Sequence, residues 1–398
     1  VDKAEWHLSI LRSGRGPHER ALWLDYDTGR SHHHFDGMNI GLFAFGLDLL
    51  SDFGYPPTGY GGHETLEAMW YVHTAAHNTV VVDGKCQPGP HWTSEVLAAG
   101  RNEIWLERPW TRGLRNNAPK MYEQTSQYER TLWLTDIAEH AFYVLDIFRV
   151  VGGTDHAKLT HSGQAALETR GLTCAPAENF IANSLLRNFR ADARAPASWI
   201  ADFHLQDPHN YRRRQARKIT AAPETLVDAI GGGSPPPCAV QLRVYDLTPD
   251  SEAGTLECWV NDGGYNVASV VWIPAIMTRR RREQGNLAST FVAVLEPFDG
   301  QPGIRAVRRA ALQTADGRAL GAAHVALAVE LADGRTDYYV MLNAGPHHGE
   351  GAEWRPGVGV RAPDWGLETD AEACVLRRGP GAAEEPVLFR GSYARMAP

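Results

Sequence analysis

Two histidine-rich segments contain the residues of this chain that are best suited to hold a metal ion. The first is SHHHFDGMNIGLFAFGLDLLSDFGY at residues 31–55, and the second is HTAAHNTVVVDG at residues 73–84. Neutral imidazole and carboxylate groups are the usual ligands of zinc and other borderline metals. If the start of the first segment is extended, side chains alternate, so His32, His34 and Asp36 share one face.

With Asp52 and His77, these groups predict a metal site that allows two kinds of chemistry. His34 and Asp36 with the distant His77 match the two-histidine, one-carboxylate triad that holds non-haem iron with open positions. Alternatively, the metal anchors a sheet, and a neighbouring histidine transfers protons in an adjacent groove. Residue spacing does not separate the two.

β-Strands predominate among the elements that must position these groups. Residues 131–151 form two apolar runs around a polar turn, and residues 324–343 form the clearest hairpin, with Asp333-Gly334 at its tight turn. Further strands are predicted at residues 39–46, 47–52, 239–247, 269–274 and 289–296, and the best helical segment is residues 63–70. Many strands separated by Gly and Pro favour packed sheets over βαβ units.

The fold class expected is therefore all-β, a large antiparallel two-sheet (super)sandwich followed by a smaller C-terminal β domain. The stretch FDGQPG at residues 298–303 follows a strand and suits a domain boundary. We accordingly expect one domain at residues 1–297, which carries the histidines and aspartates, and a second at residues 298–398. GGGSPPP at residues 231–237 is expected to be a long loop or a linker.

Composition excludes several classes of protein. With 39 Lys+Arg against 47 Asp+Glu the formal charge is -8, so an overall basic nucleic-acid footprint is absent. No run of about 18 apolar residues is present, so we expect no membrane-spanning segment. The five cysteines form no C-x-x-C pair, and they indicate neither a disulfide framework nor a thiolate zinc site.

The order of motifs resembles the heparinase II/III-like family of polysaccharide lyases. The resemblance is carried by WHLSILRSG (6–14), HHHFDGMNIGLFAFGLDLLSDFGY (32–55), TAAHNTVVVDG (74–84) and YVLDIFRVVGG (143–153) with His156 and His161. It covers roughly residues 6–165, and STFVAVLEPF (289–298) also fits. The family acts on uronic-acid polymers such as heparin, heparan sulfate or alginate-type chains, so an anionic polysaccharide is the expected substrate.

The resemblance implies a role for each residue of the cluster. His32 would belong to the catalytic groove, whereas His34, Asp52 and His77 would bind a zinc ion that mainly supports the site. Asp36 would be a structural hydrogen-bonding partner rather than a ligand.

The implied reaction is β-elimination, in which a base removes the C5 proton of a uronate and an acid protonates the departing O4. Histidine and tyrosine suit these roles. His32 is the expected base or carboxylate partner, and Tyr55 and Tyr60 follow Asp52 closely enough to line the same groove.

The resemblance also implies partners and a location. In the family an α/α toroid precedes the sandwich and supplies the principal catalytic tyrosine, and nothing of that kind precedes Trp6. We therefore expect this chain to be the sandwich half of an active site, in the periplasm or secreted, with a second copy as a further candidate partner. Two alternatives stay open: a non-catalytic zinc-containing glycan-binding sandwich, and an iron oxygenase using His34, Asp36 and His77.

Overall fold

The computed structural model describes residues 1–29, 34–90, 93, 95–207, 238–345, 351–383 and 385–396. Within these ranges every pairing between named strands is antiparallel, which confirms the all-β prediction. No helix in the described ranges is both long and apolar enough to span a membrane. His32 and residues 231–237 lie outside the described residues.

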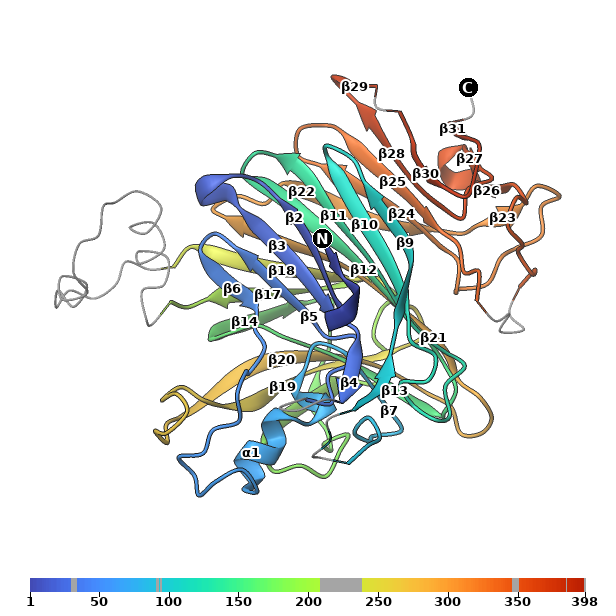
Figure 1. Cartoon of the computed structure of the whole chain (residues 1–398). Helices are drawn as coiled ribbons and strands as arrows, with labels where there is room; N and C mark the ends of the chain where they lie inside the picture. Colours follow the sequence, from blue (N-terminus) through green and yellow to red (C-terminus); the bar gives the residue numbers. More distant parts are fainter. Residues whose placement is uncertain are drawn as a thin grey trace.

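An eight-stranded sheet forms the central layer of the molecule (Figure 1). The predicted hairpin over residues 131–151 is confirmed as its two long strands β11 and β12, which turn at Glu139 and His140. In sheet order the strands are β14 (Ala165–Arg170), β17 (Trp199–Leu205), β18 (Val240–Asp246), β21 (Ala288–Asp299), β12 (Ala141–Val151), β11 (Gln127–Ala138), β10 (Thr111–Asn117) and β9 (Arg101–Glu107).

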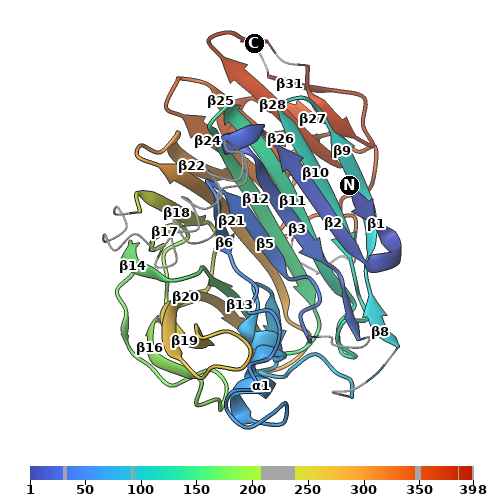
Figure 2. The same cartoon turned by 60° about the vertical axis from the view of Figure 1, so that its left-hand side comes forward.

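A second sheet from the N-terminal part of the chain lies over one face of this layer (Figure 2). Its strands are β1 (Asp2–Lys3), β2 (Leu8–Ser13), β3 (Arg20–Asp25), β5 (Ile40–Ala44) and β6 (Leu47–Leu50). Alternate residues such as Leu11, Leu22 and Leu42 are buried against the eight-stranded sheet, so the residues between them face outward. The two strands predicted to meet near Gly46 are confirmed as β5 and β6.

A third sheet, below in Figure 1, completes the same core with one face, and one short helix packs on this sheet in a separate apolar cluster. The sheet contains β15 (Ala175–Pro176), β16 (Leu186–Asp192), β19 (Glu252–Asn261), β20 (Val270–Arg281), β13 (Asp155–His161) and β7 (Val80–Val82). Helix α1 spans Leu66–Tyr71, three residues after the predicted start at residue 63. It begins there because the Thr65 hydroxyl accepts a hydrogen bond from the backbone N–H of Ala68.

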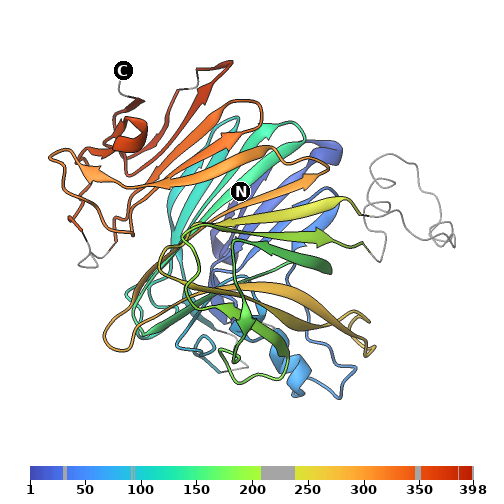
Figure 3. The ribbon, with the colours of Figure 1, turned by 180° about the vertical axis from the view of Figure 1, so that it is seen from behind.

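The C-terminal strands pack on the opposite face of the eight-stranded sheet (Figure 3). They are β22 (Ile304–Ala310), β24 (Val325–Leu331), β25 (Thr336–Met341), β28 (Ala373–Gly379), β29 (Ala382–Ala383) and β30 (Val387–Phe389). A further small sheet covers them with β23 (Gln313–Thr314), β26 (Val360–Ala362), β27 (Leu367–Thr369) and β31 (Ala394–Met396). The predicted 324–343 hairpin is confirmed, with Gly334 at φ +89° in the turn.

Sheets thus cover both faces of the eight-stranded sheet, and those on the face opposite the N-terminal sheet come from the C-terminal part of the chain. The remaining small pairing joins β4 (Asp27–Gly29) to β8 (Val96–Ala99). The chain leaves the eight-stranded sheet at Asp299 and enters the C-terminal sheet at Ile304. The division into domains at residues 1–297 and 298–398 stays a prediction.

His156, on β13, gives the fold a testable pH dependence. Its ring is fully buried, Nε2 donates to the Gly152 carbonyl at 2.6 Å, and Nδ1 accepts from the Ser289 hydroxyl at 2.8 Å. Burial lowers its pKa to about 4, so protonation favours the unfolded chain. The contribution of the neutral His156 ring to the free energy of unfolding is therefore complete above about pH 6.5, and it falls by roughly 3 kcal/mol as the pH drops towards 4.

We expect His156→Gln to flatten the decline in urea-unfolding free energy between pH 6.5 and 4. His140→Gln, at an exposed turn, is the matched control, and it should show the same pH dependence of the unfolding free energy as the wild type. Equal slopes for wild type and His156→Gln would contradict this assignment.

Candidate metal centre and groove

Four candidate metal ligands converge beside the N-terminal sheet. Each of His34, Asp36, Asp52 and His77 offers one ligand atom, and these atoms lie within 4.8 Å of one another. His34 and Asp36 precede β5 and point to one side while Phe35 between them is buried, as the predicted alternation requires. Asp52 follows β6, and His77 follows the short 3-10 helix η3 (Thr74–Ala76).

His77 shows how well this cluster fits a cation. Its side chain is fully buried, and neither ring nitrogen has a hydrogen-bond partner among the residues that the structure describes. Its Nδ1 lies 3.3 Å from Oδ2 of Asp52, and Nδ1 of His34 lies 3.9 Å from Oδ1 of the same carboxylate. A buried polar atom without a partner is costly. A metal bound between these groups would satisfy the imidazole.

The carboxylates around the cluster repel one another. Burial, reinforced by the charges of Asp25 and Asp52, raises the pKa of Asp36 well above its usual range. Burial and the charge of Asp27 raise the pKa of Asp25 to about 8. Burial alone would also raise the pKa of Asp52, but the imidazoles of His77 and His34 lower it instead. A site with this excess of negative charge suits a divalent cation.

Two asparagines, which the sequence reasoning did not single out as site residues, connect the ligands. The Asn39 amide donates to Oδ2 of Asp52 at 2.9 Å and accepts from the backbone N–H of Asn78 at 2.9 Å. The Asn78 amide in turn accepts from the N–H of His161 at 2.8 Å. The chain order His77-Asn78 is visible in the sequence, but the pairing of Asn78 with Asn39 is not.

Arg130, on β11, holds both ligand-bearing loops against the eight-stranded sheet. Its Nη1 donates to the carbonyls of Met38 and Asn78, each at 2.6 Å. Its Nε and Nη2 bind the two oxygens of Asp146 at 2.8 and 2.7 Å, and Lys158 also contacts that carboxylate at 2.8 Å. All of these side chains are buried, so the guanidinium fixes the loops through a buried network of charge-assisted hydrogen bonds.

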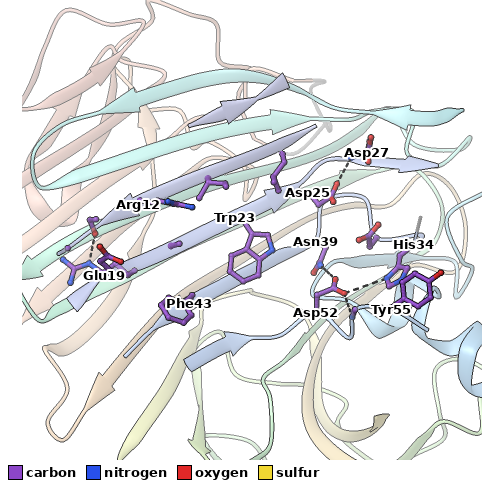
Figure 4. A pocket seen from close by; sticks show the side chains of 18 of the residues that line it. Arg12, Glu19, Trp23, Asp25, Asp27, His34, Asn39, Phe43, Asp52 and Tyr55 are labelled. Carbon is purple, nitrogen blue, oxygen red and sulfur yellow. Dashed lines mark hydrogen bonds and ion pairs between the residues drawn. The ribbon is translucent and has the colours of Figure 1, made fainter. Parts of the chain in front are cut away.

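An open groove of 1040 Å³ begins at the cluster and follows the outward face of the N-terminal sheet (Figure 4). His34, Asp36 and Asp52 line one end. Trp23 lies in the middle, and Arg12 and Glu19 lie towards the far end. The cluster therefore faces a space that is large enough for several sugar units of a chain.

The structure places the two predicted tyrosines differently. Tyr55 lines the groove beside His34, is 48% exposed, and contacts the ring of Tyr265 edge-on at 5.2 Å. Tyr60 is not among the residues that line this groove, and its ring packs edge-on against Trp259 at 5.1 Å. The geometry thus brings Tyr55, but not Tyr60, to the groove, while the roles assigned to both, and to His32, stay predictions.

Removing the Arg130 side chain should loosen the whole centre. Arg130→Met leaves Asp146 buried without its main partner, so we expect the free energy of unfolding to fall by roughly 3–5 kcal/mol. Arg305→Met, which breaks the exposed ion pair with Glu330, should cost about 1 kcal/mol or less. Urea unfolding of both variants measures this, and equal losses would contradict the role of Arg130.

Comparison with known sequences supports a family assignment. The profile of the family described as "Heparinase II/III-like, C-terminal" matches residues 24–222, half of the chain. A protein named exo-oligoalginate lyase from Saccharophagus degradans is 33% identical over 106 residues, which is 25% of this chain and 14% of that protein.

Comparison with solved structures shows the same fold at low identity. Heparan sulfate lyase HepC from Pedobacter heparinus superposes with a TM-score of 0.53 at 16% identity, over 86% of this chain and 42% of that one. The heparinase III BT4657 gene product gives a TM-score of 0.52 at 12% identity, over 82% of this chain and 40% of that one. This chain thus spans about two fifths of their length. With half of its length matched by the family profile, the chain belongs to the heparinase II/III-like family.

Proposed function

We propose that this chain forms the β-sandwich side of the active site of a lyase that cleaves uronic-acid polysaccharides by β-elimination. The observation that carries the proposal is the open groove with the His34, Asp36, Asp52 and His77 cluster at one end. The family assignment supports lyase chemistry, and the names of the relatives, exo-oligoalginate lyase and heparan sulfate lyase, describe enzymes that act on uronic-acid oligomers or polymers. Enzymes encounter uronic-acid polysaccharides in the periplasm or outside the cell, and we expect this protein to act there.

The elimination needs a base, an acid and a neutralised carboxylate. The C5–H bond breaks and its proton passes to the base, while the electron pair forms the C4=C5 double bond and expels O4, which takes a proton from the acid. We assign His32 as base or carboxylate partner, and Tyr55 lies where it would contact a sugar beside the cluster. Proton transfer by such positioned groups contributes typically about 10²–10⁴-fold. A toroid domain would supply the opposite wall and further catalytic groups.

We further propose that the cluster holds zinc through His34, Asp52 and His77. A bound zinc ion would add positive charge at this end of the groove and fix the two imidazoles. Asn39 would hold Asp52 in position through its amide. Asp36 would act as a hydrogen-bonding partner, although it lies inside the cluster.

Metal content separates this assignment from the alternative ligand set. We expect about one zinc per purified wild-type chain, lost in Asp52→Ala and kept in Asp36→Ala, as elemental analysis would measure. Asp48→Ala is the matched control, because Asp48 lies on β6 outside the cluster. Iron that survives Asp52→Ala and disappears in Asp36→Ala would instead favour an oxygenase with His34, Asp36 and His77.

The reaction itself is tested by the products. We expect the chain joined to its toroid domain to release unsaturated uronates from alginate, heparan sulfate or heparin, detected by ultraviolet absorbance and mass, and the chain alone to release few or none. His32→Ala should lower the rate at least about 100-fold, with His33→Ala as control.

Three outcomes would contradict the proposal. Saturated products would indicate hydrolysis, and oxygen consumption would indicate the oxygenase. Polymer binding without any cleavage, even with the toroid present, would indicate a glycan-binding module.

A further inference from the structure

The outward face of the N-terminal sheet presents an ordered set of side chains to the groove. Strand register places Ile10, Trp23 and Gly41 in one row across β2, β3 and β5. The next row, away from the cluster, contains Arg12, Ala21 and Phe43. The row of Asp25 at the cluster and the row of Arg12 are four residues apart, or about 14 Å along a strand.

Trp23 lies flat on the sheet because its neighbour is a glycine. A Cβ atom on Gly41 would come within 1.8 Å of the indole ring carbon Cζ2 and 2.0 Å of Cε2. The ring therefore occupies the space that any other residue at position 41 would fill, and one face of the half-buried indole is left to the groove. Such an apolar platform suits the C–H face of a sugar ring.

Arg12 supplies positive charge beside this platform. Only two arginines and no lysine line the groove among the described residues. Arg20 is buried and bound to Asp136 at 2.6 Å, whereas Arg12 is exposed and has no ion pair within the described part of the chain. Its planar guanidinium suits a carboxylate or sulfate through two parallel hydrogen bonds. The small side chain of Ala21 leaves room between Arg12 and Phe43 on the sheet.

We propose that Trp23, Arg12 and Phe43 form a subsite for an anionic sugar unit, separate from the metal cluster. The indole stacks on the ring, and Arg12 binds its carboxylate or sulfate. This inference rests on the proposed function and deepens it, because it assigns the charge selectivity of the groove to residues that touch no metal ligand. The Arg12 row lies about 14 Å along the strands from the row of Asp25, so the anionic group bound by Arg12 is held away from the metal cluster.

Binding measurements on this chain test the subsite without requiring cleavage. The probes are an alginate hexasaccharide and the neutral hexasaccharide cellohexaose, titrated by calorimetry. We expect Trp23→Ala to weaken binding of the alginate probe about tenfold and Trp23→Phe to restore part of it. Trp6→Ala, which removes a tryptophan that is 72% exposed and does not line the groove, should bind as the wild type does.

Arg12 should control charge selectivity. Arg12→Ala should weaken binding of the alginate probe about tenfold and remove the preference over cellohexaose, while Arg12→Lys keeps part of that preference. Arg15→Ala removes an exposed arginine that does not line the groove and is the matched control. Gly41→Ala should weaken binding as much as Trp23→Ala, because the methyl group displaces the indole. Thermal unfolding checks that each variant is folded.

The inference is overturned if the wild type shows no preference for the alginate probe, or if Trp23→Ala and Arg12→Ala match their controls. Its failure is distinct from failure of the proposed function. If unsaturated products form but oligosaccharide binding does not depend on Trp23 and Arg12, the lyase proposal stands and the subsite proposal is wrong. In the toroid-containing enzyme, the Trp23→Ala and Arg12→Ala variants should raise KM with little change in kcat. Binding that depends on Trp23 and Arg12 but is not followed by elimination would support the subsite and contradict the lyase proposal.

Discussion

The site depends on one buried guanidinium. Arg130 reaches from the eight-stranded sheet to the carbonyls of Met38 and Asn78, so it joins the loop before β5 to the loop before β7. Taking a charge into the core is expensive unless every donor is paired, and here Asp146 and the two carbonyls together accept from Nε, Nη1 and Nη2. Because those loops carry His34, Asp36 and His77, the geometry of the cluster follows from this pairing.

The same arrangement explains why the groove begins at the cluster. The inward residues of the N-terminal sheet form the core with the eight-stranded sheet, so its outward residues are free to line a binding surface. The charged ligands lie at one end, where Asn39 holds Asp52. Trp23 and Arg12 lie further along the same strands, so one rigid sheet positions both the candidate metal centre and the proposed subsite.

Local patterns predicted the strands well, because alternation and turn residues act over short distances. The hairpins at β11–β12 and β24–β25 and the meeting of β5 with β6 follow from such signals. The motif order brought His34, Asp52 and His77 together in prediction, and the structure places them within one cluster. Pairings across long sequence separations gave no local signal. Arg130 with Met38, Asn39 with Asn78, and Trp23 over Gly41 each require the strand register, which only the folded sheets supply.

The central claim is that the cluster fixed by Arg130 is a metal centre at the end of a substrate groove. Diffraction from crystals grown with zinc, recorded on both sides of the zinc absorption edge, tests it most directly. We expect an anomalous peak about 2.0–2.2 Å from ligand atoms of His34, Asp52 and His77. No peak at the cluster, or a peak bound to Asp36 in place of Asp52, would contradict it.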